Sequence, residues 1–175
     1  KVLLVDTMVD SQLIDISLIE EKITSKTKVI IPVHLNGCMV DMKKLGELAK
    51  KYGLFLIEDA TQALFCKDKS GYAGTLSDIG VFSFGITKLT TTGQGGVAVT
   101  NDRKLFEKMR LVHNHGVPLG KTRESAYNIL GCNFKFTDIQ ASAGIAQLNN
   151  AEERIKHVNV VYEKYKMGIK SLPFL

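Results

Sequence analysis

Cysteine and proline are both scarce in this chain of 175 residues. It has three prolines and three cysteines, and the cysteines (Cys38, Cys66 and Cys132) are odd in number, widely spaced and without a CxxC motif. This pattern argues against a disulfide-stabilised scaffold and provides no ligand spacing for a zinc module. A chain of this length buries a substantial core without either, so we expect an ordinary folded domain in a reducing compartment.

Long apolar runs are also absent. No stretch approaches the ~20 residues of a membrane span, and the opening KVLLVD is interrupted by Asp6, too early for the core of a signal peptide. We therefore expect a cytoplasmic protein without membrane attachment. Because the chain starts with Lys1 instead of Met, we also expect it to be a fragment.

Blocks of like charge are missing as well. The net charge of +5 comes from 23 Lys and Arg against 18 Asp and Glu, mixed together at helical spacings. Such a mixture is typical of a solvated surface, and no basic block with interleaved aromatic residues favours nucleic-acid binding. We do not expect nucleic acid as a partner.

The first sixty residues alternate between strand and helix patterns. Apolar runs predict strands at 2–5, 28–33 and 54–59, and apolar residues at helical spacing predict helices over 10–23 and 42–52. Asp41 and Gly53 are suited to cap the second of these helices. Continuous apolar strands between one-sided helices are the pattern of an α/β fold with a parallel sheet covered on both faces.

The second half of the chain has longer connections. Strand patterns at 80–84 and 96–100 flank a Thr- and Gly-rich segment whose single charge is Lys88, and a helix pattern follows at 101–112. The polar stretch 113–132 predicts a loop long enough to be functional. Thr137 and Gln140 then form a capping box before a long helical pattern, which we expect to break near Asn149 and Asn150.

Five segments carry a resemblance to a known family. They are PVHLNGCMVDM at 32–42, IEDATQA at 57–63, FSFGITKLTTTGQGG at 82–96, RLVHNHG at 110–116 and GCNFKFTDIQASAG at 131–144. In this order and at comparable spacings they resemble the DegT/DnrJ/EryC1/StrS sugar aminotransferases, which depend on pyridoxal 5'-phosphate (PLP). The resemblance implies the mainly parallel α/β fold of aspartate aminotransferase, fold type I. It also implies that residues 1–175 are an incomplete PLP-binding large domain, lacking an upstream segment and a C-terminal small domain.

Two residues match the chemical needs of PLP most directly. The cofactor needs a carboxylate that keeps its pyridine nitrogen protonated and a lysine that holds its aldehyde as a Schiff base. Asp59 ends a predicted parallel strand, where open α/β sheets bind ligands, and the resemblance makes it the pyridinium partner. Its alternative is a turn or cap aspartate.

Lys88 lies at the family's FSF-xxx-K spacing, which marks the Schiff-base lysine. A lysine partly withdrawn from water has the lowered pKa that this chemistry requires, and the freed amine then serves as general base and acid. The alternative is an exposed loop lysine.

The resemblance implies three further cofactor contacts. Ser83 stands where the family places a hydroxyl on the phosphate; the alternative is an inward-facing strand serine. Gln62 corresponds to a contact with the ring hydroxyl; the alternative is a plain surface glutamine. Asn133 corresponds to a phosphate contact that reaches in from the partner subunit of a homodimer; the alternative is an asparagine that stabilises a turn.

Other motifs carry no such chemistry. His113 and His115 lie two residues apart in a predicted loop and lack the further ligands of a metal site, so we expect no metal. With His34 they match histidines of the family, and we expect them to shape the site or loop without a catalytic role. The segment GVPLGKT at 116–122 is one residue too short for a phosphate-binding P-loop. Its Lys121, with Arg123, is a hypothetical contact for the diphosphate of a nucleotide-linked sugar.

The expected reaction moves an amino group from glutamate or glutamine to a keto group of a nucleotide-linked sugar. Gln94 and Leu89 replace the family's usual Glu and Asn, which leaves the fit of the substrate open. One alternative is a PLP-dependent sugar dehydratase, in which the family has histidine in place of the lysine. The other is a non-catalytic, regulatory relative.

Overall fold

The computed structural model describes residues 1–118, 120, 129–170 and 172. Two compact units make up the chain. The first comprises Lys1–Ser83 and Gly96–Lys135, and the second comprises Phe84–Gly95 and Phe136–Leu175.

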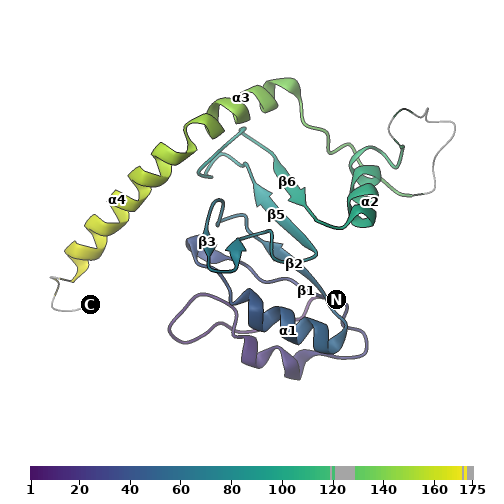
Figure 1. Cartoon of the computed structure of the whole chain (residues 1–175), viewed down its shortest axis with the longest axis horizontal. Coiled ribbons are helices and arrows are strands. Elements are labelled where there is room, and N and C mark those ends of the chain that lie inside the picture. Colours follow the sequence, from purple (N-terminus) through teal and green to yellow (C-terminus); the bar gives the residue numbers. More distant parts are fainter. Residues whose placement is uncertain (119, 121–128, 171, 173–175) are drawn as a thin grey trace. The chain divides into compact units, whose positions relative to one another are not determined.

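A four-stranded sheet organises the first unit (Figure 1). Its order is β1-β2-β5-β6, with the bounds Val29–Ile30, Phe55–Asp59, Ile79–Ser83 and Gly96–Val99. β1 and β5 lie parallel to β2, whereas β6 pairs antiparallel with β5. This mostly parallel sheet with helices confirms the predicted α/β class. The small hairpin of β3 (Lys67–Asp68) and β4 (Gly71–Tyr72) was not predicted.

Helix α1, Met42–Tyr52, forms as its sequence predicts. The side chain of Asp41 accepts a hydrogen bond from the Lys44 backbone N–H at 3.1 Å, and Gly53 ends the helix in the left-handed conformation, with φ of 61°. Figure 1 shows α1 beside the β1–β2 end of the sheet. Its apolar face completes the main core, whose buried members are Leu13, Ile19, Ile30, Val40, Met42, Leu45, Ala49 and Leu56.

The predicted helix over 10–23 is wrong. Two 3-10 turns take its place, η1 at Ile16–Leu18 and η2 at Glu20–Lys22. The carboxylate of Asp15 accepts the Ser17 N–H at 2.9 Å, so a cap forms in the middle of the predicted helix and competes with its backbone bonds.

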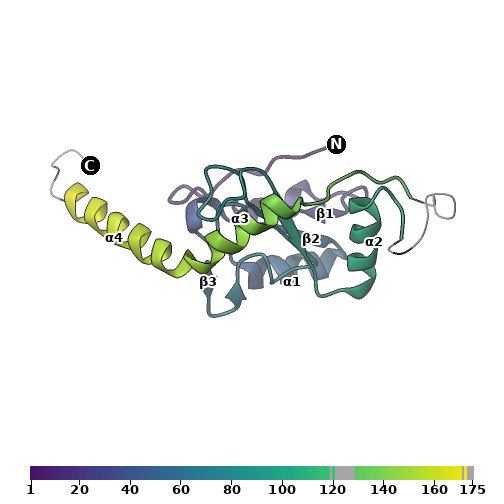
Figure 2. The ribbon, with the colours of Figure 1, turned by 90° about the horizontal axis from the view of Figure 1, so that it is seen from above.

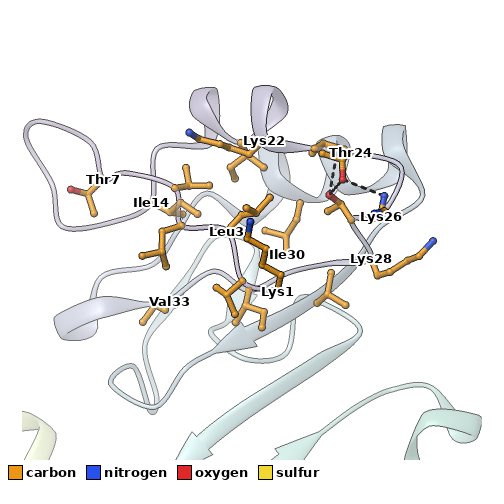
Figure 3. Close-up of a pocket in the computed structure, with 18 of the residues that line it drawn as sticks. Lys1, Leu3, Thr7, Ile14, Lys22, Thr24, Lys26, Lys28, Ile30 and Val33 are labelled. Carbon is orange, nitrogen blue, oxygen red and sulfur yellow. Dashed lines mark hydrogen bonds between the residues drawn. The ribbon is translucent and has the colours of Figure 1, made fainter.

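The predicted strand at 2–5 is also wrong. The backbone pairs locally just beyond it, through an antiparallel bridge between Thr7 and Ile14. Residues 1–5 instead line a cavity of about 1020 Å³, whose lining lies between Lys1 and Leu35. Figure 3 shows Leu3, Ile14 and Ile30 around this cavity, with the amino groups of Lys22 and Lys28 pointing away from it. A strand sequence without a hydrogen-bonded neighbour does not form a strand.

Strand β1 is shorter than the predicted 28–33. Pro32 has no N–H to donate, so regular pairing stops at Ile30, and only an isolated bridge joins Val33 to Asp59.

Downstream of the sheet, α2 spans Arg103–His113 and is capped by Asp102, which accepts the N–H groups of Lys104 and Leu105. A third 3-10 turn, η3, occupies Leu35–Gly37.

The second unit consists of the segment 84–95 and two helices. α3 spans Asp138–Asn149 and α4 spans Ala151–Ile169, and Figure 2 shows them as successive parts of one extended helical stretch. The predicted capping box of Thr137 and Gln140 is present, and the predicted break falls at Asn150. Among the described residues, no helix is long and apolar enough to cross a membrane.

Gly80 allows β5 to pass close to the segment after β4. A Cβ atom at this position would lie 1.8 Å from the carbonyl oxygen of Gly74. Backbone cannot yield as a flexible side chain does, so we expect Gly80→Ala to lower the free energy of unfolding by about 3 kcal/mol or more. Chemical denaturation of both proteins measures this difference.

Gly46 provides the matched control, because a Cβ there, in the middle of α1, has no atom within 4 Å. Gly46→Ala is expected to stabilise the protein by about 0.5–1 kcal/mol. Equal free energies of unfolding for the two variants would contradict the close approach at Gly80.

Candidate active site

Asp59 ends β2, and backbone bonds from both sides hold it there. Its N–H donates to the carbonyl of Pro32 and its own carbonyl accepts the N–H of His34, both at 2.9 Å. The next N–H along the chain donates to Val81 on β5. The half-buried Asp59 side chain accepts the Thr61 N–H at 3.0 Å. This last bond is that of a turn aspartate, and it leaves the residue at the predicted carboxyl edge of the sheet.

Ser83 ends the neighbouring strand. β2 and β5 are parallel, with Asp59 opposite Val81, so Ser83 lies two residues beyond that pair at the same edge. It is half-buried and pairs with Gly96 of β6. A carboxylate and a hydroxyl therefore stand at the carboxyl ends of adjacent parallel strands, where α/β sheets bind ligands.

Gln62 lies on the turn that follows β2. Its side chain is exposed, and its Oε1 accepts the backbone N–H of Asn36 at 3.2 Å. Asn36 has a left-handed φ of 52°, so the glutamine supports an unusual backbone conformation in η3. Gln62 is thus tied to a second loop at this edge of the sheet.

Asn133 belongs to a segment that pairs with the end of α2. It forms an antiparallel bridge with Asn114, and the adjacent His115 N–H donates to Cys132 at 3.0 Å. The Asn133 Oδ1 accepts the Lys135 N–H at 3.4 Å, as expected for an asparagine that stabilises a turn. The side chain is exposed. Lys121 and Arg123, proposed for the diphosphate, lie outside the described residues.

Lys88 lies in the second unit, within the loop 84–95. Two backbone bonds at the base of this loop, from Phe84 to Gly95 and from Thr92 to Phe84, bring its ends together at 2.8 and 3.0 Å. The Lys88 N–H donates to Gly85 at 3.0 Å, and the side chain is half-buried. Because the loop carries no other charged residue, Lys88 supplies its only charge.

Arg154 of α4 anchors this loop, although no pattern in the sequence indicates it. Its Nη1 donates to the Leu89 carbonyl at 3.1 Å and also to the side chain of Gln147. Gln140 of α3 donates from Nε2 to the carbonyl of Gln94 at 3.0 Å. Both side chains hold backbone carbonyls of the loop, and the Leu89 carbonyl directly follows Lys88.

Replacement of Arg154 by Met is expected to loosen the loop around Lys88. Methionine retains an unbranched stem comparable to the apolar part of the arginine but has no donors, and a hydrogen bond from a charged group contributes about 1.5–3 kcal/mol. Hydrogen exchange at Leu89–Thr92 should quicken by roughly 10- to 100-fold. The matched control is Lys156→Met on the exposed side of the same helix, which should leave this exchange unchanged. Similar exchange in both variants would exclude the anchor.

A buried pair, His34 and Glu58, lies directly beside Asp59 in the fold. The His34 Nε2 and the Glu58 Oε2 are 2.9 Å apart, and both side chains are 0% exposed. The same carboxylate accepts the N–H of Gly74 at 2.8 Å and that of Leu76 at 2.7 Å. Burial raises the pKa of Glu58, but hydrogen bonds to the carboxylate lower it by more, so the pKa lies below its usual value.

The site residues are distributed over the two units. Asp59, Gln62, Ser83 and Asn133 belong to the first unit, and Lys88 belongs to the second. Lys88 follows Ser83 by five positions in the sequence. The structure brings Asp59 and Ser83 to one edge of the sheet, whereas Asn133 lies in the segment that pairs with the end of α2.

A family model matches the whole chain, residues 1–175. It describes the DegT/DnrJ/EryC1/StrS aminotransferases. The chain belongs to this family. The predicted resemblance is thereby confirmed, and the folds of solved family members agree with the mostly parallel α/β architecture.

Individual members of the DegT/DnrJ/EryC1/StrS family show the range of these similarities. The GDP-perosamine synthase of Escherichia coli O157:H7 is 42% identical over 96% of this chain and 46% of its own length. The pleiotropic regulatory protein of Geobacillus stearothermophilus is 39% identical over 82% of this chain and 39% of its own length. The chain thus spans less than half the length of these relatives.

Among solved structures, the putative sugar aminotransferase Spr1654 from Streptococcus pneumoniae, in its PLP form, superposes with a TM-score of 0.88. Its sequence is 26% identical, and the match covers 97% of this chain and 48% of the pneumococcal one.

The donor groups of the two units fit PLP in kind. At the edge of the sheet in the first unit, the carboxylate of Asp59 suits the pyridine nitrogen and the hydroxyl of Ser83 suits the phosphate. In the second unit, the half-buried amine of Lys88 suits the aldehyde. The described residues thus include a group of each type for the ring nitrogen, the phosphate and the aldehyde.

Proposed function

We propose that this chain carries the PLP-binding part of an aminotransferase that acts on nucleotide-linked sugars. The observation that supports it most is the pair of Asp59 and Ser83 at the ends of two neighbouring parallel strands, followed in the chain by Lys88. A cofactor with a basic ring nitrogen and a phosphate needs these two groups. Family membership over all 175 residues supports these roles.

Each residue has a defined task in this proposal. Asp59 holds the proton on the ring nitrogen, Ser83 binds the phosphate, and Gln62 contacts the ring hydroxyl. Lys88 attaches the cofactor and then moves the proton between the cofactor and the substrate carbon. When bound, PLP supplies the electron sink that makes this proton removable.

The proposal extends to the substrates and the assembly, and the family membership supports it. We propose glutamate or glutamine as the amine donor and a keto group of a nucleotide-linked sugar as the acceptor. A relative in the same family is named GDP-perosamine synthase, which supports a nucleotide-linked sugar as the substrate class. We also propose a homodimer in which Asn133 binds the phosphate of the neighbouring subunit.

A direct assay tests the reaction. The full-length protein is loaded with PLP and incubated with glutamate or glutamine and a panel of nucleotide-linked keto sugars. Mass spectrometry then searches for the amino sugar in each mixture. An amino sugar that forms only with both substrates present supports the proposal, and its absence from every mixture would reject it.

One relative supports a second function. The similarity to a pleiotropic regulatory protein is compatible with a regulatory member of the family. A purely regulatory protein does not need the attachment lysine, whereas a catalytic one does. Exclusive labelling of Lys88 by PLP would favour catalysis. A dehydratase is disfavoured because this chain has Lys88 at the position where that branch has histidine.

A further inference from the structure

We propose that His34 and Glu58 form a positioning couple that sets the carboxylate of Asp59 against the ring nitrogen of the cofactor. This inference rests on the proposed role of Asp59. The couple itself touches no cofactor or substrate in this proposal. It acts through the end of β2, which it ties to the turn after β1 and to the segment before β5.

The hydrogen bonds define the protonation of the couple. The Val40 N–H donates to the His34 Nδ1 at 3.1 Å, so Nδ1 carries no proton. The proton of the neutral ring is therefore on Nε2, from which it donates to Glu58. The buried Glu58 carboxylate then accepts hydrogen bonds from the imidazole and from the N–H groups of Gly74 and Leu76.

The couple links segments that are far apart in the sequence. His34 is 24 positions from Glu58, and Gly74 follows Glu58 by 16 positions. Through these bonds the end of β2 is tied to the turn after β1 and to the segment before β5. Glu58 precedes Asp59 directly, and successive strand residues face opposite sides, so the buried residue anchors the strand whose next residue faces the site.

His34 also holds the backbone of Asp59. Regular pairing of β1 ends at Ile30, and Pro32 contributes only its carbonyl. The His34 N–H, bonded to the Asp59 carbonyl at 2.9 Å, is therefore the last link between this segment and β2. A residue whose ring is fixed by Val40 and Glu58 thus fixes the backbone of Asp59. Displacement of a catalytic group by about 1 Å can cost roughly 100-fold in rate.

Stability alone does not explain why a charged Glu58 is buried beside His34. Two buried apolar side chains of similar size would stabilise a fold as well as a buried polar pair or better, because no charge would lose its hydration. Directional hydrogen bonds, by contrast, define one arrangement. The role of the couple is therefore to fix the position of the end of β2.

The substitution Glu58→Gln tests the couple with almost no change in shape. An amide has one accepting oxygen, so whichever way it turns, its NH2 group faces a donor: either the His34 N–H or a backbone N–H. The end of β2 is then expected to shift. The readout is the protonation of the ring nitrogen, followed by NMR of 15N-labelled PLP in the full-length protein as a function of pH.

We expect the pKa of this ring nitrogen to fall by about one pH unit in Glu58→Gln, because the displaced Asp59 carboxylate no longer stabilises its protonated form as well. kcat should fall by roughly 10- to 100-fold while KM for the sugar stays within about threefold. His34→Gln keeps a donor for Glu58, so the ring nitrogen should retain most of its wild-type pKa in this variant. If Glu58→Gln does not fold, His34→Asn, which also breaks the bond to Glu58, takes its place.

The control is Glu47→Gln, on the exposed side of α1, which should change none of these values. A Glu58→Gln protein with lower thermal stability but an unchanged ring-nitrogen pKa would overturn the couple and leave a structural role. Failure of the proposed function has a different signature: the wild-type protein would not bind PLP, or Asp59→Asn would leave the ring nitrogen protonated.

Discussion

Lys88→Ala is expected to abolish covalent attachment of PLP and to lower the rate of amino transfer by at least about 10³-fold. The change removes both the amine that bonds the cofactor and the group that moves the proton, and general acid–base catalysis alone contributes about 10²- to 10⁴-fold. The measurement adds PLP to the full-length protein, reduces the mixture with borohydride and maps the modified peptide by mass spectrometry. Wild type should carry the pyridoxyl group on Lys88 alone.

Surface lysines also react with PLP, so a control is needed. Lys108 is exposed on α2, and Lys108→Ala should leave the adduct on Lys88 and the rate unchanged. Addition of a free amine such as methylamine should recover part of the lost proton transfer in Lys88→Ala. Labelling spread evenly over surface lysines in wild type would contradict the assignment of Lys88.

Asp59→Asn is the second change with a large expected effect. The amide keeps an oxygen that accepts the Thr61 N–H, so the turn and the fold should remain. It loses the negative charge, and a charged hydrogen bond contributes about 1.5–3 kcal/mol, which corresponds to roughly 10- to 150-fold in kcat. PLP should still attach to Lys88, but its ring nitrogen should no longer be protonated near neutral pH.

Two measurements separate this effect from a general loss of structure. The circular dichroism and thermal midpoint of Asp59→Asn should match wild type, and so should those of Asp10→Asn, an exposed aspartate far from the sheet edge in the sequence. Asp10→Asn should also retain full activity. Full activity of Asp59→Asn would instead favour the alternative in which this residue is only a turn aspartate.

In the proposed function, the two units would contribute different kinds of support. Asp59 and Ser83 lie on the ends of paired strands in the first unit, which are rigid supports. Lys88 lies in a loop of the second unit whose backbone is held by Arg154 and Gln140. A reactive amine would have to move during catalysis, and a loop anchored at a few backbone carbonyls permits local motion of the side chain.

Elements with local signals were predicted from the sequence. Helix α1 has its cap at Asp41 and its stop at Gly53, α3 has its capping box, and the break before α4 falls at Asn150. Each of these features depends on contacts within about four residues of the chain. Contacts this short can be predicted from the order of the residues alone.

The errors near the N-terminus have one physical cause. The apolar pattern at 2–5 suits a strand and the spacing over 10–23 suits a helix, but both states need long-range partners. Asp15 makes a local cap, and Thr7 pairs with Ile14, so the chain adopts turns instead. Hydrophobic periodicity alone does not show whether a neighbour is available to complete the pattern.

By itself, the sequence determined the family, the α/β class and the residue types suited to PLP, because these are written in motifs of a few residues. Only the tertiary structure decided which distant residues support them. His34 meets Glu58 across 24 positions, and Arg154 meets Leu89 across 65. Hydrogen bonds of this kind leave no periodic trace in a single sequence. They form when folding brings the two segments together, and burial then makes each unpaired group costly.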